Sequence, residues 1–140
     1  AQLHDIGKLA IPDEILRKSG PLDEPEWQFV RQHTLVGERI LRASPQMRSV
    51  ASVVRSTHEH WDGTGYPDAL AGEDIPLAAR IVGACDAYVA MLAPRPYRDA
   101  RPPEEALSEL ERLAGAQFDP TVSRVLAGIV RERLEAERAA

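Results

Sequence analysis

Hydrophobic residues recur along most of this chain at the three- and four-residue spacings of amphipathic helices. The segment 76–93, PLAARIVGACDAYVAMLA, differs because it is apolar almost all round, and it predicts a central, buried helix. Little of the chain alternates between apolar and polar residues in the way that is typical of strands. The pattern therefore predicts an all-α fold.

Capping residues and helix breakers divide the rest of the chain. The chain begins in what reads as the last turn of a helix, with Gly7 as its expected stop. Asp23 and Asp119 are expected N-caps, since a proline follows each in the first turn. Further helices are predicted over 12–20, 21–44, 45–60, 102–115 and 119–140, with loops over 61–76 and 94–103. No internal repeat or boundary interrupts them, so residues 1–140 are expected to form a single compact domain.

Composition narrows the partners that this domain can have. The formal net charge of −5 argues against a nucleic-acid polymer or an anionic membrane surface as the main partner. A small anionic ligand stays open, because local charges and metals decide its binding. The single cysteine, Cys85, excludes a disulfide framework and fits a reducing, cytoplasmic compartment. No apolar run approaches the roughly 20 residues that span a bilayer, so no membrane insertion is expected.

Histidines supply most of the candidate chemistry, and the chain has four of them: His4, His33, His58 and His60. His4 is followed by Asp5, and an imidazole beside a carboxylate is a suitable ligand pair for a divalent metal. A lone histidine on a helix, such as His33, is more often structural than a ligand. If the helix continues past His58, His60 points roughly 200° away from it, which favours a surface position.

Three further residues stand out against their surroundings. Asp86 lies within an apolar helix, where a carboxylate is costly unless it is paired or binds a metal. Gly37 lies one helical turn beyond His33, and a glycine there indicates the close approach of another helix or of a ligand. Lys8 lies one turn beyond His4, where it either answers a helix dipole or points to a substrate anion beside a metal.

Six stretches occur in an order that resembles the HD-GYP family, a branch of the HD metal-dependent phosphohydrolases: LHDIGKLAIPDEIL, HTLVGERIL, HEHWDGTGYP, ARIVGACDAYVAML, RPYR and AGAQFDP. The match runs from Leu3 to about Leu126. The resemblance implies an HD-type helical domain of about six helices that binds two or three divalent metal ions, iron or manganese. It also implies hydrolysis of cyclic di-GMP in bacterial signalling, behind an upstream receiver or sensor domain.

The resemblance also assigns roles to individual residues. The implied metal ligands are His4, Asp5, His33, His58 and Asp86, with Asp5 bridging two ions. Asp5 and Lys8 are the implied catalytic residues, and Lys8, Tyr66, Arg95 and Arg98 are the implied substrate-binding residues. Asp62, Gly63, Gly65 and Pro67 shape the Gly-Tyr-Pro loop, which also offers a surface for a protein partner.

Two departures from the family pattern keep a second function open. The family has a ligand histidine on a helix upstream of the HD pair, and residues 1–140 are expected to lack that helix. Thr57 stands where the family has the first histidine of its His-His-Glu triplet, and a hydroxyl is a poor neutral ligand beside imidazole. The chain is therefore either an active phosphodiesterase or a degenerate module that binds a ligand or a protein. A phosphohydrolase acting on another nucleotide is a weaker reading, because the Gly-Tyr-Pro loop argues against it.

Overall fold

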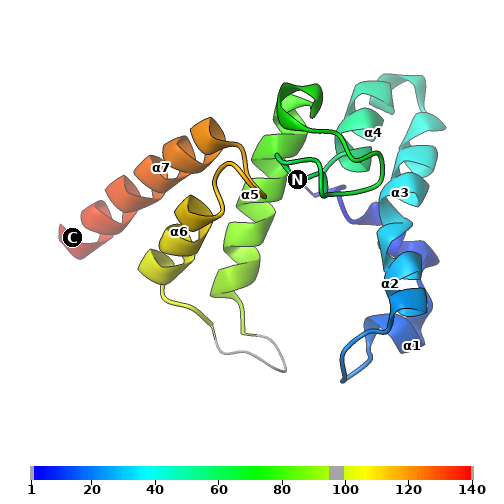
Figure 1. Cartoon of the computed structure of the whole chain (residues 1–140), viewed down its shortest axis with the longest axis horizontal. Coiled ribbons are helices and arrows are strands. Elements are labelled where there is room, and N and C mark those ends of the chain that lie inside the picture. The colour runs from blue at the N-terminus through cyan, green and yellow to red at the C-terminus, as the bar shows by residue number, and fades with distance from the viewer. Residues whose placement is uncertain (1, 95–99, 140) are drawn as a thin grey trace.

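The computed structural model describes residues 2–94 and 100–139, and within them the chain is all-α, as the hydrophobic pattern predicted (Figure 1). The α-helices are α1 (Asp13–Leu16), α2 (Glu24–Arg31), α3 (His33–Arg42), α4 (Arg48–Arg55), α5 (Leu77–Leu92), α6 (Pro103–Arg112) and α7 (Pro120–Ala139). Short 3-10 helices lie at η1 (Ile6–Ala10), η2 (Pro45–Met47) and η3 (Gly72–Asp74). All α-helices but α1 have eight residues or more, in line with the expected number of about six.

The helices pack in two groups that meet at α4 and α5 (Figure 1). In the first group α3 packs on η1 and α4, around Leu41, Ala51 and Val54. In the second group α5, α6 and α7 enclose a larger core. Its buried members are Ala84, Tyr88, Met91, Ala106, Leu107, Leu110, Phe118 and Ala127. The long loop between α4 and α5 runs across the junction, so its residues can contact both groups.

Three of the predicted helices are shorter or more divided than expected, and the one over 12–20 is reduced to α1 (Asp13–Leu16). The segment 21–44 forms two helices, because regular hydrogen bonding is interrupted at Gln32 between α2 and α3. Its start was predicted correctly: the Asp23 carboxylate accepts the Glu26 N–H at 2.9 Å, and the Glu26 carboxylate accepts the Asp23 N–H at 2.8 Å. The predicted helix over 45–60 stops at Arg55, so the expectation that it continues through the histidines was wrong.

Gly7 does not end a helix; it lies buried within η1 and allows that segment to touch α3. A Cβ at Gly7 would lie 1.8 Å from the His33 carbonyl oxygen, so only glycine fits. The close approach predicted for Gly37 is confirmed, since a Cβ there would lie 3.0 Å from Val54 Cγ1 and 3.4 Å from the Gly7 nitrogen. These two glycines hold the chain's first histidine and aspartate against the start of α3.

Helix α5 is central, as predicted, but it is not buried all round. Leu77 and Val89 are more than half exposed, because the helix packs on α6 and α7 through one side only. At α7 the predicted cap is confirmed: the Asp119 carboxylate accepts the Thr121 N–H at 2.7 Å, and it also pairs with Arg80. Within the described parts of the chain, no helix combines the length and apolar character needed to cross a membrane.

Candidate metal centre

Five predicted ligands from four separate segments come together where the two helix groups meet. His4 and Asp5 precede η1, His33 begins α3, His58 lies in the turn after α4, and Asp86 lies on α5. Asp5, His33 and His58 each offer one ligand atom, and these atoms all lie within 4.8 Å of one another. His4 Nε2 lies 3.2 Å from Asp86 Oδ1 and 3.6 Å from Asp5 Oδ2. The aspartate that follows the first histidine thus connects two sets of ligands.

The local structure orients His33 toward this cluster. Its Nδ1 lies 2.6 Å from the carbonyl oxygen of Val30. Because a carbonyl oxygen only accepts hydrogen bonds, Nδ1 carries the proton and Nε2 keeps its lone pair. Nε2 lies 3.8 Å from Asp5 Oδ1. The imidazole is therefore in the tautomer that binds a metal through Nε2.

Several buried atoms of the cluster lack a hydrogen-bond partner among the described residues. They are Asp5 Oδ1, His33 Nε2 and His58 Nε2. Leaving a buried polar atom unsatisfied costs about 1–3 kcal/mol, so three together need an explanation. All three belong to residues whose ligand atoms lie within 4.8 Å of one another. A divalent cation would satisfy them at once, so the residues fit a metal site.

The protonation states of the ligands also suit a cation. Burial, followed by the nearby His33, lowers the pKa of His58 to about 4, and burial lowers the pKa of His33 as well. Burial raises the pKa of Asp5, but its hydrogen bond and charge interaction with Lys8 outweigh this and lower the pKa overall. At neutral pH the site therefore presents neutral imidazoles and an ionised carboxylate, as metal binding requires.

Asp86 differs from its sequence-based description, whereas the role predicted for Lys8 stays a prediction. Asp86 was expected to be buried, but its side chain is 45% exposed, because this part of α5 borders an open pocket. Its partner is His4 rather than a group of the core. The Lys8 ammonium lies 2.7 Å from Asp5 Oδ2 and is half-exposed, so it stands at the mouth of the ligand cluster.

The Gly-Tyr-Pro loop closes over one side of the cluster. The Tyr66 ring stacks on His58 at a centroid distance of 5.2 Å and an interplanar angle of 9°, and the Tyr66 N–H donates to the His58 carbonyl at 3.1 Å. Gly65 permits this contact, since a Cβ there would lie 2.2 Å from the His60 nitrogen. Pro67 follows in a cis peptide bond. The loop thus places Tyr66 beside a candidate ligand.

Hydrogen bonds also hold the tip of this loop. The Asp62 carboxylate accepts the Thr64 N–H at 2.9 Å and the Thr64 hydroxyl at 2.6 Å, while Gly63 has a positive φ of 81°. His60 contacts Thr64 at 3.1 Å and lies outside the ligand cluster. Arg95 and Arg98, the other implied substrate-binding residues, lie outside the described part of the chain.

Sequence reasoning missed the residues that fasten the loop to the helices. The buried Glu59 carboxylate accepts the N–H groups of Asp68 at 2.7 Å and Leu70 at 3.0 Å. Arg55 donates twice to the Asp68 carboxylate, at 2.6 Å each, and once to Glu38 on α3 at 2.6 Å. The partners of Arg55 lie 13 and 17 residues away in sequence, so no local pattern could have indicated them.

Replacing Glu59 with alanine is expected to free residues 68–70 of the loop. Two hydrogen bonds to a charged group disappear, and the free energy of unfolding should fall by roughly 2–4 kcal/mol. Urea unfolding measures that loss, and hydrogen exchange at the Asp68 and Leu70 amides locates it. Glu59→Gln, which keeps one acceptor, should lose less. Unchanged exchange at both amides would show that the carboxylate does not hold the loop.

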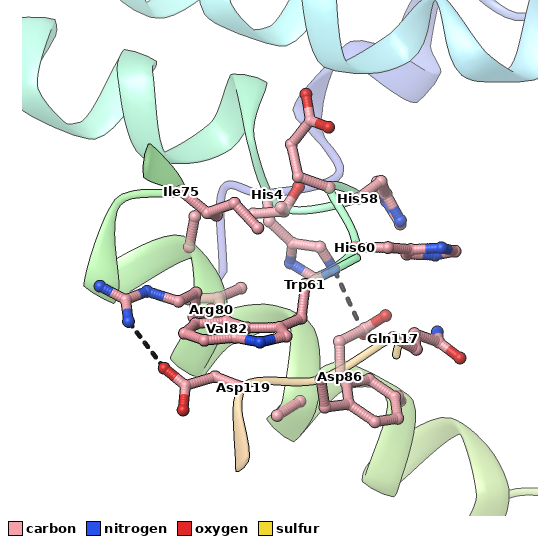
Figure 2. A pocket seen from close by; sticks show the side chains of 17 residues that line it. His4, His58, His60, Trp61, Ile75, Arg80, Val82, Asp86, Gln117 and Asp119 are labelled. Carbon is pink, nitrogen blue, oxygen red and sulfur yellow. Dashed lines mark hydrogen bonds and ion pairs between the residues drawn. The ribbon is translucent and has the colours of Figure 1, made fainter. Parts of the chain in front are cut away.

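Thr57 is buried and does not point its hydroxyl at the cluster. Its Oγ1 donates to the Val54 carbonyl at 3.0 Å. The residue instead borders a pocket of about 120 Å³ beside the candidate centre, which His4, His58 and Asp86 also line. Figure 2 shows His4 and Asp86 facing each other there, with Arg80 and Asp119 paired at the far end. The position that departs from the family pattern thus adjoins open space next to the ligands.

Comparisons with known proteins agree with this architecture. The HD domain family matches residues 1–122. The chain is 44% identical over 124 residues to a cyclic di-GMP phosphodiesterase of Thermotoga maritima, covering 87% of this chain and 34% of that protein. It is 42% identical to the cyclic di-GMP phosphodiesterase response regulator RpfG of Xanthomonas campestris, covering 99% of this chain and 36% of the relative. It is also 42% identical to the 3'3'-cGAMP-specific phosphodiesterase 2 of Vibrio cholerae, covering 89% of this chain and 24% of that protein.

A solved structure supports the fold. The cyclic GMP-AMP specific phosphodiesterase V-cGAP3 of Vibrio cholerae superimposes with a TM-score of 0.68 at 22% identity, over 92% of this chain and 36% of that one. The chain therefore spans about a third or less of the length of these relatives. The helical fold, the HD pair and the matched signatures together confirm the resemblance, and the chain belongs to the HD domain family, in its HD-GYP branch.

Proposed function

We propose that this chain is the catalytic domain of a metal-dependent phosphodiesterase that hydrolyses cyclic di-GMP in bacterial signalling. One observation carries the proposal: ligand atoms of Asp5, His33 and His58 converge within 4.8 Å, while His4 and Asp86 meet beside the same aspartate. The names of the curated relatives support the substrate class, because they are phosphodiesterases of cyclic di-GMP or 3'3'-cGAMP.

The two oxygens of Asp5 face different partners, which supports a site for two ions. Oδ1 lies toward His33, and Oδ2 lies toward His4. His33 and His58 would hold one ion, His4 and Asp86 would hold the other, and Asp5 would bridge them. A mixed set of imidazole and carboxylate ligands suits iron or manganese. A third ion would need ligands from outside this set.

The side chains around the ligands suit an anionic substrate. When bound, divalent metal ions supply Lewis-acid chemistry for the attack of water on a phosphodiester. Lys8, at the mouth of the cluster, would bind a non-bridging phosphate oxygen and offset its charge. Tyr66, stacked on His58, would contact the substrate beside that ligand. Arg95 and Arg98 are proposed to bind the substrate as well.

The test is turnover by the chain loaded with Mn²⁺ or, without oxygen, Fe²⁺. Chromatography should show cyclic di-GMP converted to the linear dinucleotide or to GMP, and 3'3'-cGAMP tested in parallel would show which substrate is preferred. Loss of activity on chelation and its return on adding metal would support the proposal. A metal-loaded chain that leaves both substrates intact would contradict it.

A degenerate module that binds without turnover is the second candidate, and Thr57 favours it. The Thr57 hydroxyl donates to a backbone carbonyl, and a hydroxyl is a poor neutral ligand, so we infer that this position supplies none. We predict that Thr57→His raises the metal content per chain, because the side chain can enter the adjoining pocket toward His4 and Asp86. Metal analysis after reconstitution measures the change, with Thr57→Ser as the control. Unchanged metal content would mean that position 57 does not reach the centre.

We propose that this domain works in the cytoplasm, behind an upstream receiver or sensor domain. The short span of the chain within its relatives supports this, and one of those relatives is named a response regulator. A histidine from the family's upstream helix would then complete the ligands beside the pocket. The Gly-Tyr-Pro loop is the proposed surface for a protein partner. Metal stoichiometry of the longer protein, with that histidine replaced by alanine, tests the completion of the site.

A further inference from the structure

The Arg31 guanidinium lies next to the candidate metal centre, although nothing in the sequence singled it out. Arg31 is the last residue of α2, two positions before His33. Its Cζ lies over the Tyr66 ring, 5.9 Å from the centroid, and that same ring stacks on His58. The Arg31 cation is therefore linked to the candidate ligand His58 through one side chain, Tyr66. It lies on the side of the centre that the Gly-Tyr-Pro loop covers.

The other described cations with contacts near the centre form short ion pairs with carboxylates. Lys8 lies 2.7 Å from Asp5. Arg55 makes three hydrogen bonds of 2.6 Å to Asp68 and Glu38, and Arg80 pairs with Asp119 at 2.7 Å. Each of these pairs would have to break, or to share its charge, before the cation could bind a substrate.

Arg31 forms a longer and more exposed ion pair than these cations do. In the described part of the chain it pairs with Glu24, at 3.4 Å, and both side chains are exposed, Arg31 by 47% and Glu24 by 64%. An ion pair of this kind contributes little to stability, so a stronger anion can replace the carboxylate. The planar guanidinium can bind a phosphate through two parallel N–H groups.

We propose that Arg31 is a substrate-binding residue that binds the second phosphodiester of a cyclic dinucleotide, the one that is not hydrolysed. This inference rests on the proposed function. A cyclic dinucleotide carries two phosphodiesters, and only one of them can occupy the metal centre. Tyr66 contacts both His58 and Arg31, so a substrate that reaches the metal centre and Arg31 together would lie alongside this ring. The residue would then favour cyclic dinucleotides over substrates with a single phosphodiester.

The experiment compares two substrates in the metal-loaded chain and in Arg31→Met. For cyclic di-GMP we expect KM to rise about 10- to 100-fold with kcat nearly unchanged, as for the loss of a charged hydrogen bond. For bis(p-nitrophenyl) phosphate, which has one phosphodiester, we expect the two proteins to behave alike. Arg31→Lys should recover part of the affinity. Arg131→Met is the matched control. Arg131 lies on α7, is 52% exposed and pairs with Glu111 of α6, so it is a similarly exposed arginine away from the candidate centre.

The outcomes separate this inference from the proposed function. An unchanged KM for cyclic di-GMP, or an equal loss with both substrates, would overturn the role of Arg31 while leaving the enzyme in place. If the parent chain turns over neither substrate, equilibrium binding of cyclic di-GMP decides. If Arg31→Met binds cyclic di-GMP more weakly than the parent chain and Arg131→Met does not, the result would support the role of Arg31 in a degenerate module. Equal binding by both proteins, or no binding by the parent chain, would overturn it.

Discussion

Alanine in place of Asp5 is expected to yield a folded chain that no longer retains metal. Among the described residues, Asp5 is the proposed ligand that lies close to both His33 and His4, so its loss removes the carboxylate shared by the two proposed sets of ligands. The imidazoles that remain near it carry no negative charge and cannot offset the charge of divalent ions. We expect metal content to fall from the proposed two ions per chain to less than one, and turnover to disappear.

The fold should survive this change, which makes the result interpretable. The ion pair between Asp5 and Lys8 is more than one-third exposed on both sides, and such pairs contribute about 0–1 kcal/mol. Elemental analysis after reconstitution measures the metal, and thermal unfolding of the metal-free protein checks the fold. Asp13→Ala is a suitable control, because Asp13 is exposed and pairs only loosely with Arg17, at 3.6 Å. Parental metal content in Asp5→Ala would overturn the assignment of the centre.

The second large effect is expected at Gly7, where alanine should prevent η1 from packing on α3. The added Cβ would lie 1.8 Å from the His33 carbonyl oxygen and 2.6 Å from the Gly37 nitrogen. Both are backbone atoms of one helix, so they cannot move aside as a side chain would. We expect a loss of more than about 3 kcal/mol in the free energy of unfolding, because overpacking against backbone exceeds the usual core penalty.

Two other glycines calibrate this prediction. Gly37→Ala should cost less than Gly7→Ala, since its closest contact is the side-chain atom Val54 Cγ1 at 3.0 Å. Gly128→Ala should stabilise the chain by about 0.5–1 kcal/mol, because that glycine lies inside α7 with no atom within 4 Å of the added Cβ. Urea unfolding gives all three values. Equal stability for Gly7→Ala and the parent chain would show that η1 does not need this contact.

Sequence reasoning was reliable where local chemistry decides structure. The caps at Asp23 and Asp119 were predicted correctly, because a carboxylate at these positions satisfies helix N–H groups within the same few residues. It failed where distant packing overrides local signals. Gly7 was read as a helix stop but serves a contact with α3, and the segment 45–60 stops at Arg55 rather than continuing through the histidines.

The candidate site shows the same division between local and distant information. The types of ligand and their order along the chain were visible in the sequence, as was Thr57 at the position of an expected histidine. The sequence could not show that Asp86 is half-exposed and faces His4, or that Glu59 and Arg55 fasten the loop. These facts depend on where α3, α4 and α5 lie relative to one another.

By itself, the sequence determined the helical class through its hydrophobic spacing, and the family through six motifs whose order resembles that of the family. Side-chain chemistry and that resemblance together named the candidate metal ligands. Only the tertiary structure decided which of those residues meet, how Asp5 divides its oxygens between two sets of ligands, and that Arg31 stands beside Tyr66. The physical reason is that the site is assembled from segments up to about 80 residues apart, and contacts over such separations are set by the packing of helices rather than by local sequence.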